Sequence, residues 1–150
     1  MKDRPIRIAT RAVIVEEGRL LLVNAFPGPH SNLWCAPGGG VEKGQSLPDN
    51  LAREVLEETG LVIDVGAPCL VNEFHNPLDG FHQVEMFFRC RIVSGELDQT
   101  WQDPERIVER RRFFAPRELE SIRLKPDSLP RVAFNEGLIA GYDALELLVK

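Results

Sequence analysis

The first third of the chain alternates apolar and polar positions in the way that β-strands require. Ile6–Val15 alternates and is rich in β-branched residues, which predicts a strand. Glu16–Arg19 predicts a tight turn, and Leu20–Ala25 predicts the returning strand of a hairpin. The prolines and glycine of Asn24–Asn32 indicate a loop, and Leu33–Ala36 is expected to follow it as a short strand.

The next segment has the spacing and the ends of an amphipathic helix. Leu47–Thr59 is preceded by Ser46, a residue type that caps helices, and Pro48 suits the first turn. Gly60 stands where a helix commonly ends in a left-handed residue. An apolar stripe on this helix is expected to face a sheet, and it consists of Leu51, Ala52, Val55 and Leu56.

The rest of the chain predicts more strands and then helices. This order predicts an α/β fold with a mixed sheet covered by helices, because strands and helices do not alternate regularly. The expected strands are Val62–Val65, Cys69–Phe74, Phe81–Val93 and Ile107–Phe114, and the expected helices are Pro116–Ile122 and Ser128–Val149.

Composition narrows the class of protein. Of 150 residues, 43% are apolar and 27% are charged, which is the balance of one globular domain spanning residues 1–150. The net charge of −5 argues against a nucleic-acid duplex as partner. No apolar run approaches the ~20 residues of a membrane span. Residues 1–5 lack the apolar stretch of a signal peptide, so we expect no membrane association and a cytoplasmic location.

Three glutamates of the expected helix lie on one face. Glu54, Glu57 and Glu58 are spaced i, i+3 and i+4, which brings their carboxylates together. Two such charges ~6 Å apart repel by only about 0.7 kcal/mol in water. The cluster alone therefore does not require a metal, and by itself it favours a solvated helix face.

The loop before the helix favours the metal site. Pro37–Gly40 is rich in glycine, so its backbone can approach a ligand or the helix closely. From Gly39 to Leu61 the sequence GGVEKGQSLPDNLAREVLEETGL resembles the Nudix box, Gly-x5-Glu-x7-Arg-Glu-U-x-Glu-Glu-x-Gly-U, where U is aliphatic. Six of the seven fixed positions match, and Gln45 replaces the first Glu.

The resemblance implies a fold, a reaction and a site. It implies a Nudix-type α/β/α sandwich with a mixed sheet, and Mg²⁺- or Mn²⁺-dependent hydrolysis of a nucleoside diphosphate linked to another group. The implied metal ligands are Glu54, Glu57 and Glu58, with Arg53 beside them. We expect the substrate to lie against the backbone of Gly39 and Gly40.

Gln45 is the one departure from the pattern. Glutamine keeps a carbonyl acceptor but loses the charge, so Arg53 can donate to Gln45 or pair with Glu57 at i+4. We expect weakened but retained activity.

Several residues outside the box are candidates for the site. Glu85 lies in an apolar strand, and it is expected either as a base or ligand or at an exposed edge; Glu73 and Glu105 are weaker candidates. Trp101 is expected to contact a base or sugar, or else to anchor its loop, whereas Trp34 is expected in the core.

Three functions remain open at this point. The first is a metal-dependent nucleotide pyrophosphohydrolase acting on a small nucleoside diphosphate derivative. The second is a Nudix-like module that binds a nucleotide, or regulates through it, with weak hydrolysis or none, and Gln45 supports it. The third is a scaffold whose acidic helix has no ligand. The sequence identifies neither the substrate nor the general base, and it leaves open whether the chain forms a homodimer.

Overall fold

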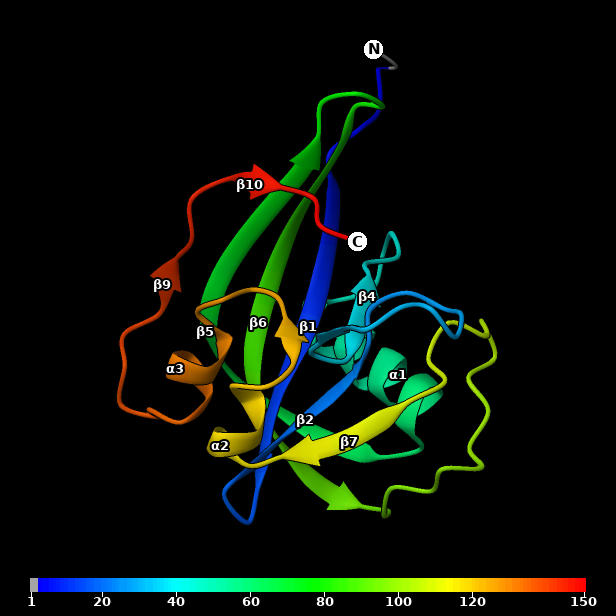
Figure 1. Ribbon diagram of the computed structural model, residues 1–150, viewed down its shortest axis with the longest axis vertical. Helices are drawn as coiled ribbons and strands as arrows, with labels where there is room; N and C mark the ends of the chain where they lie inside the picture. The colour runs from blue at the N-terminus through cyan, green and yellow to red at the C-terminus, as the bar shows by residue number, and fades with distance from the viewer. Residues whose placement is uncertain (1–2) are drawn as a thin grey trace.

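A computed structural model describes residues 3–150, and within them ten strands form one curled, mixed sheet (Figure 1). Met1 and Lys2, on which the expectation of no signal peptide partly rests, lie outside the described residues. The strand order is β10-β5-β6-β1-β2-β3-β8, with β4 on β1, β7 on β2 and β9 on β5. The strands are β1 Arg7–Glu16, β2 Arg19–Asn24, β3 Leu33–Cys35, β4 Gly38–Gly40, β5 Val62–Asn76, β6 Phe81–Ser94, β7 Arg111–Phe114, β8 Arg123–Leu124, β9 Gly141–Tyr142 and β10 Glu146–Leu147.

Strand β1 is the centre of the sheet. It runs parallel to β6 along one edge, from Arg7 opposite Gln83 to Ile14 opposite Cys90. Along its other edge it pairs antiparallel with β4 and then with β2, so the predicted hairpin is confirmed. Because β4 leads into the acidic helix, this pairing places the glycine-rich segment between the helix and the sheet.

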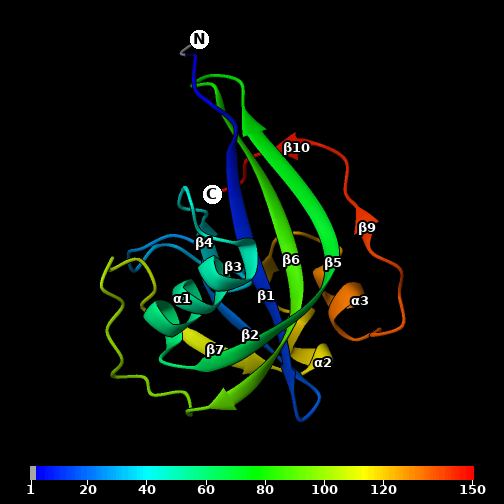
Figure 2. The ribbon, with the colours of Figure 1, turned by 180° about the vertical axis from the view of Figure 1, so that it is seen from behind.

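Two apolar cores cover the two faces of the sheet, as an α/β/α sandwich requires. Helix α1 (Leu47–Thr59) buries Leu51 and Val55 against one face. Helices α2 (Pro116–Leu119) and α3 (Leu129–Ala133) close the other face, where Trp34 packs edge-on against Phe114 as expected for a core residue. Figure 2 shows α1 on the opposite side of the sheet from α2 and α3.

Helix α1 begins and ends where its sequence predicts. The Ser46 hydroxyl accepts a hydrogen bond from the Asp49 backbone N–H at 3.1 Å, and Gly60 ends the helix with φ of 76°. Leu56 differs from expectation: it is 43% exposed, so the apolar stripe is narrower than its sequence suggests.

The predicted strand Ile107–Phe114 is too long at its beginning, since β7 starts at Arg111. Two buried side chains accept hydrogen bonds from the backbone N–H groups of residues 107–110, just before β7. Asp103 accepts from Ile107 and Val108, and Asn24 accepts from the next two residues. With these donors already satisfied, the segment forms a loop. The predicted strands Val62–Val65 and Cys69–Phe74 are one bulged strand, β5.

The predicted final helix Ser128–Val149 is wrong. Helix α3 spans only Leu129–Ala133, and the predicted helix Pro116–Ile122 is likewise shorter, ending at Leu119. Gly137 and Gly141 disfavour helix, and the chain instead adds β9 and β10 to the free edge of β5. None of the helices in residues 3–150 has the length and hydropathy to cross a bilayer.

Candidate active site

The backbone of β4 lies directly against a carboxylate of α1. A Cβ at Gly39 would stand 2.7 Å from the Glu54 carboxylate carbon, so any other residue there would displace that carboxylate. A Cβ at Gly40 would likewise collide with the guanidinium of Arg7. The glycines therefore allow the close approach expected from the sequence. Gly39 lies against Glu54 of the acidic helix, and Gly40 lies against the side chain of Arg7.

Three carboxylates converge beside this strand. Oxygens of Glu54, Glu57 and Glu105 all lie within 4.8 Å of one another. Opposite ligands of an octahedral Mg²⁺ are roughly 4.2 Å apart, from bond lengths of ~2.1 Å, so small side-chain movements would let the three share one ion. Burial raises the pKa of Glu54, and the charges of Glu105 and Glu57 raise it further against the effect of Arg53. A divalent cation would reverse this repulsion, so these residues fit one.

Glu58, the third metal ligand implied by the sequence, has a different environment. It is 6% exposed, and its carboxylate accepts the Gly38 backbone N–H at 3.0 Å. Burial raises the pKa of Glu58 well above its ordinary value, although Arg11 and this hydrogen bond oppose the shift. In this structure Glu58 holds β4 against α1, and its role as a ligand stays a prediction.

Glu105 takes the place beside Glu54 and Glu57, from a loop that has no regular structure. The Asp103 carboxylate accepts the backbone N–H groups of Glu105, Ile107 and Val108, which fixes the loop. The sequence ranked Glu105 below Glu85 because a loop residue carries no periodic signal. The turn centred on Asp103 and the attachment of its loop to α1 bring Glu105 near the helix.

Arg53 makes both contacts expected of it. Its Nε donates to the Gln45 side-chain carbonyl at 3.1 Å, and its Nη1 donates to Glu57 at 3.2 Å. The departure at Gln45 therefore keeps a hydrogen bond to Arg53 and loses only the charge.

Glu85 lies in the sheet interior and not at an exposed edge. It is 5% exposed, and its carboxylate pairs with the Arg11 guanidinium at 2.6 Å. The prediction that a charge in this strand must be paired is correct, and its partner is a protein cation. Arg11 was missed, although it shares with Glu85 the signal of a charge within an apolar strand.

Trp101 is attached to the helix and not directed into a cavity. Its indole Nε1 donates to the Glu57 backbone oxygen at 2.8 Å, and its ring lies where a Gly60 side chain would be. This geometry favours the loop anchor over the expected contact with a base or sugar. Glu73 lies away from the carboxylates, bound to His82 and Tyr142.

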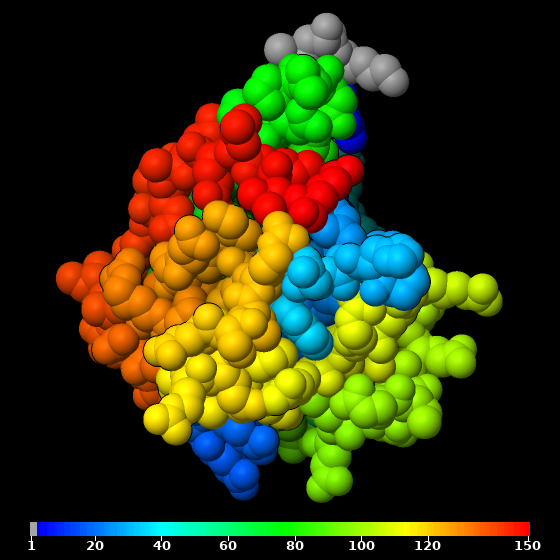
Figure 3. Space-filling model, viewed as in Figure 1, coloured from blue at the N-terminus to red at the C-terminus, as the bar shows by residue number. Residues whose placement is uncertain are grey.

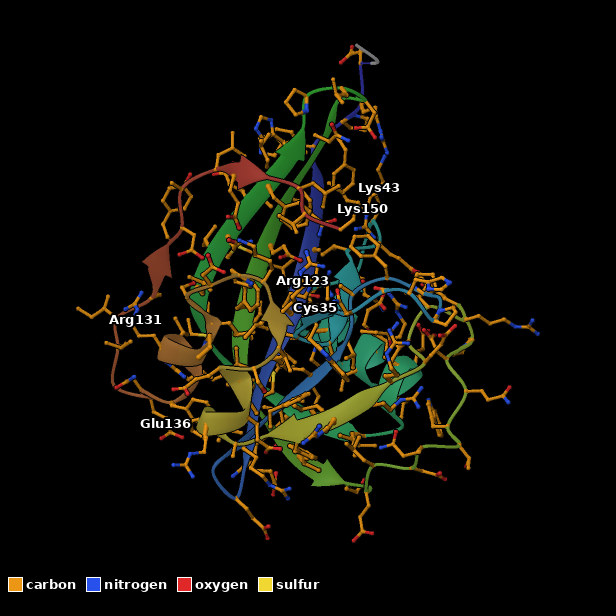
Figure 4. The ribbon with its side chains drawn as sticks, viewed as in Figure 1. Cys35, Lys43, Arg123, Arg131, Glu136 and Lys150 are labelled. Carbon is orange, nitrogen blue, oxygen red and sulfur yellow. The ribbon has the colours of Figure 1, made fainter. Side chains whose placement is uncertain are left out.

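A cavity of about 530 Å³ joins these elements, which is within the range of small-molecule sites. Glu54, Glu58, Glu105, Gly39 and Gly40 lie along one side, and Glu85 forms part of its lining. The C-terminal residues 146–150 close another side, and Figure 3 shows this segment in red running toward the light-blue loop after β2. Cys35 and Lys150 also line the cavity (Figure 4).

Arg7 was not predicted as a site residue, and it lines the same cavity. Its guanidinium donates to the side-chain carbonyl of Gln83, and within residues 3–150 it has no ion-pair partner. It therefore offers its positive charge to a ligand. Two other arginines have structural roles instead: Arg110 binds backbone oxygens of Gly28 and Ser31, and buried Arg111 binds that of Glu58.

Comparison with known proteins gives a family and a fold. A family model described as NUDIX domain matches residues 5–133. The chain is 28% identical over 90 residues to an ADP-ribose pyrophosphatase of Methanocaldococcus jannaschii, covering 60% of this chain and 53% of that protein. It is 32% identical over 106 residues to a MutT-like protein of Streptomyces ambofaciens, covering 65% and 64% of the two chains.

The chain thus spans about half to two thirds of the length of these two relatives. Solved structures are similar in fold at lower identity. A UDP-X diphosphatase superimposes with a TM-score of 0.72 at 23% identity, covering 95% of this chain and 70% of that one. A NUDIX hydrolase from Nitrosomonas europaea gives 0.73 at 21% identity, covering 89% and 90%.

Proposed function

The chain belongs to the NUDIX domain family, and we propose that it hydrolyses the diphosphate bond of a nucleoside diphosphate linked to another group, with Mg²⁺ or Mn²⁺ as cofactor. The observation that carries this proposal is the convergence of Glu54, Glu57 and Glu105 beside the backbone of Gly39. Three carboxylates that lie this close are stable together when a cation is shared among them.

The residues of the proposed site have different roles. Glu54, Glu57 and Glu105 hold the cation, which when bound neutralises charge on phosphate oxygens and acidifies a coordinated water. Arg53 orients Glu57, and Glu58 keeps β4 in place through Gly38. Glu58, which also lines the cavity, would be a fourth carboxylate available to hold the cation.

Arg7 supplies a positive charge to the proposed site. It lines the cavity without an ion-pair partner, and the planar guanidinium suits two oxygens of one phosphate. Arg7 would bind the diphosphate in the cavity, while Glu54, Glu57 and Glu105 would hold the cation. Binding by both would hold the two phosphates in one orientation while water attacks, and orientation is a large part of catalysis of this reaction.

Two names among the similar proteins support the substrate class. One relative is an ADP-ribose pyrophosphatase, and one solved structure is a UDP-X diphosphatase. A small nucleoside diphosphate derivative fits a cavity of about 530 Å³. Three free cysteines fit the reducing environment of the cytoplasm, where we place the protein.

The alternative is a module that binds a nucleotide, or regulates through it, without cleaving it. Gln45 favours this alternative because it removes one negative charge from the box. The test is incubation with Mg²⁺ and a panel of ADP-ribose, nucleotide sugars, nucleoside triphosphates and dinucleoside polyphosphates, with nucleotide products separated by ion exchange. Turnover that EDTA abolishes supports the hydrolase. Ligand-dependent stabilisation without turnover supports the binding module. The absence of both turnover and stabilisation supports the scaffold.

A further inference from the structure

The floor of the cavity beyond Arg7 is a polar surface on three adjacent strands. Side chains that alternate along β1, β6 and β5 share one face of the sheet. Strand pairing aligns them in two rows, Arg7–Gln83–Phe74 and Ala9–Glu85–Asn72. Each of these residues except Ala9 lines the cavity. Gln83 and Asn72 are each 2% exposed, so these amides lie in the interior and not on the surface.

Glu85 fixes the orientation of both amides. Its carboxylate accepts hydrogen bonds from Arg11 Nε at 2.6 Å, from Gln83 Nε2 at 3.1 Å and from Asn72 Nδ2 at 3.4 Å. A carboxylate can only accept, so the amide nitrogens must face it and the amide oxygens must point away. Glu85 is therefore a positioning residue.

The two amide oxygens have different partners. Gln83 Oε1 accepts from Arg7, whereas Asn72 Oδ1 has no hydrogen-bond partner. Within residues 3–150 it is the one buried side-chain nitrogen or oxygen in this condition. Buried polar groups are nearly always satisfied, so an unsatisfied acceptor on a cavity wall is available to a donor that enters the cavity.

Flat and apolar groups surround this acceptor. Phe74 follows Asn72 on the same face of β5, and its ring centroid is 6.0 Å from that of Phe81. Leu147 and Leu148 of the C-terminal segment line the same part of the cavity. Aromatic rings beside a single directional acceptor form a surface that suits a nucleobase or a ribose.

Asn72 lies on a different strand from the segment that contacts the carboxylate cluster. Strands β4, β1, β6 and β5 are successive neighbours, so three spacings of ~4.8 Å separate β5 from β4 by about 14 Å along the sheet. Asn72 on β5 and Gly39 on β4, which lies against Glu54, are therefore at different places along the sheet. Arg7 lies between them, on β1.

We propose that Asn72, together with Phe74, forms the nucleoside subsite of this protein, in which Asn72 Oδ1 accepts a hydrogen bond from a base N–H or a ribose hydroxyl. The proposal rests on the proposed hydrolase function, because it assumes that the ligand is a nucleoside diphosphate derivative. It makes Asn72 a specificity-determining residue, and it makes Glu85 the residue that directs Asn72.

Binding of reaction products tests this subsite without any chemistry. The affinities of AMP, GMP, CMP and UMP for the full chain are measured by calorimetry with EDTA present. The tightest is then compared with its 2′-deoxy and 3′-deoxy counterparts and with a counterpart whose base lacks N–H donors. We expect one counterpart to bind about tenfold more weakly, the value of a hydrogen bond to a buried acceptor.

Asn72→Leu should bind the tightest monophosphate about tenfold more weakly and should lose the discrimination. Its melting temperature should stay the same or rise, because the change removes an unsatisfied acceptor whose amide makes only one long hydrogen bond. Asn72→Ser, which keeps a small acceptor, should retain part of the discrimination. Glu73→Gln, on the neighbouring position of β5 and outside the cavity lining, should match the wild type in affinity and in discrimination.

Three outcomes would overturn the proposal: no monophosphate binds, no counterpart loses affinity, or both Asn72 variants discriminate as the wild type does. A lower melting temperature of both variants would also contradict it, since Asn72 would then be structural. These outcomes are separate from failure of the hydrolase function, which is loss of metal-dependent turnover in a protein that still binds the monophosphates.

Discussion

The Trp101 indole donates a hydrogen bond of 2.8 Å to the backbone oxygen of Glu57. Trp101 lies four residues before Glu105, so this bond ties the loop that carries Glu105 to the helix that carries Glu54 and Glu57. The tryptophan thus acts on the proposed metal site through the backbone of Glu57, without contacting a carboxylate in that bond.

Trp101→Phe should weaken cation binding while the fold is kept. Phenylalanine retains a ring against Gly60 but cannot donate, and the lost bond is worth about 1 kcal/mol, or roughly fivefold in affinity. Binding of Mn²⁺ followed by electron paramagnetic resonance measures the change. Unchanged affinity would show that the loop is held by other contacts.

Gly39→Ala should reduce metal-dependent turnover by about 10²-fold, because the new methyl group displaces the Glu54 carboxylate from its position. Gly137→Ala is the matched control, since nothing lies within 4 Å of a Cβ there and its activity should stay at the wild-type level. Equal activities of the two variants would contradict the close approach of β4 to Glu54.

Arg11→Met should lower the free energy of unfolding by about 3–5 kcal/mol, because it leaves the buried Glu85 carboxylate without its cation. Urea denaturation measures this loss. Arg91→Met removes a pair with Asp64 at 3.1 Å whose side chains are 80% and 64% exposed, and it should cost less than about 1 kcal/mol. A small effect at Arg11 would mean that the Glu85 carboxylate is satisfied by other donors.

The attachment of β9 to β5 should depend on pH. Hydrogen bonds from Tyr142 and then His82 lower the pKa of Glu73 below its ordinary value of 4.5. A lowered folded-state pKa gives stability that is present above pH 4.5 and is lost as the pH falls through the folded value. Tyr142→Phe should therefore melt below the wild type at pH 7 and converge with it in acid. A melting difference that is as large in acid, where Glu73 is protonated, as at pH 7 would contradict this account.

Gln45→Glu and Glu57→Gln should move activity in opposite directions. Glu57→Gln removes a proposed ligand and should lower turnover by at least about 10²-fold, since stabilisation by a bound cation is worth several kcal/mol. Gln45→Glu gives Arg53 a charged partner in a partly buried position, so a gain of roughly two- to fivefold is expected. If Glu57→Gln keeps full turnover, the site has been assigned wrongly.

Local signals were sufficient for helix α1 and for the first hairpin. Ser46 and Gly60 set the helix ends through hydrogen bonds and a backbone angle that do not depend on distant residues. The final segment had no such support, because two glycines lower its helix propensity and the open edge of β5 offers backbone partners. An edge of this kind is visible only once the sheet is assembled.

In the candidate site, too, the residues placed by local spacing were predictable and those placed by distant contacts were not. Glu54 and Glu57 were predicted because helical spacing fixes their common face. Glu105 depends on a turn centred on Asp103, and the orientation of Asn72 depends on Glu85 of a neighbouring strand. Contacts between elements far apart in the sequence leave no periodic pattern, so the sequence does not reveal them.

The most direct test of the central claim is an anomalous difference map from crystals of the protein soaked in Mn²⁺. The account predicts a peak bound by carboxylate oxygens of Glu54, Glu57 and Glu105, beside Gly39. The peak should be absent from crystals of Glu57→Gln soaked in the same way. No peak in the wild-type crystals, or a peak elsewhere in the chain, would contradict it.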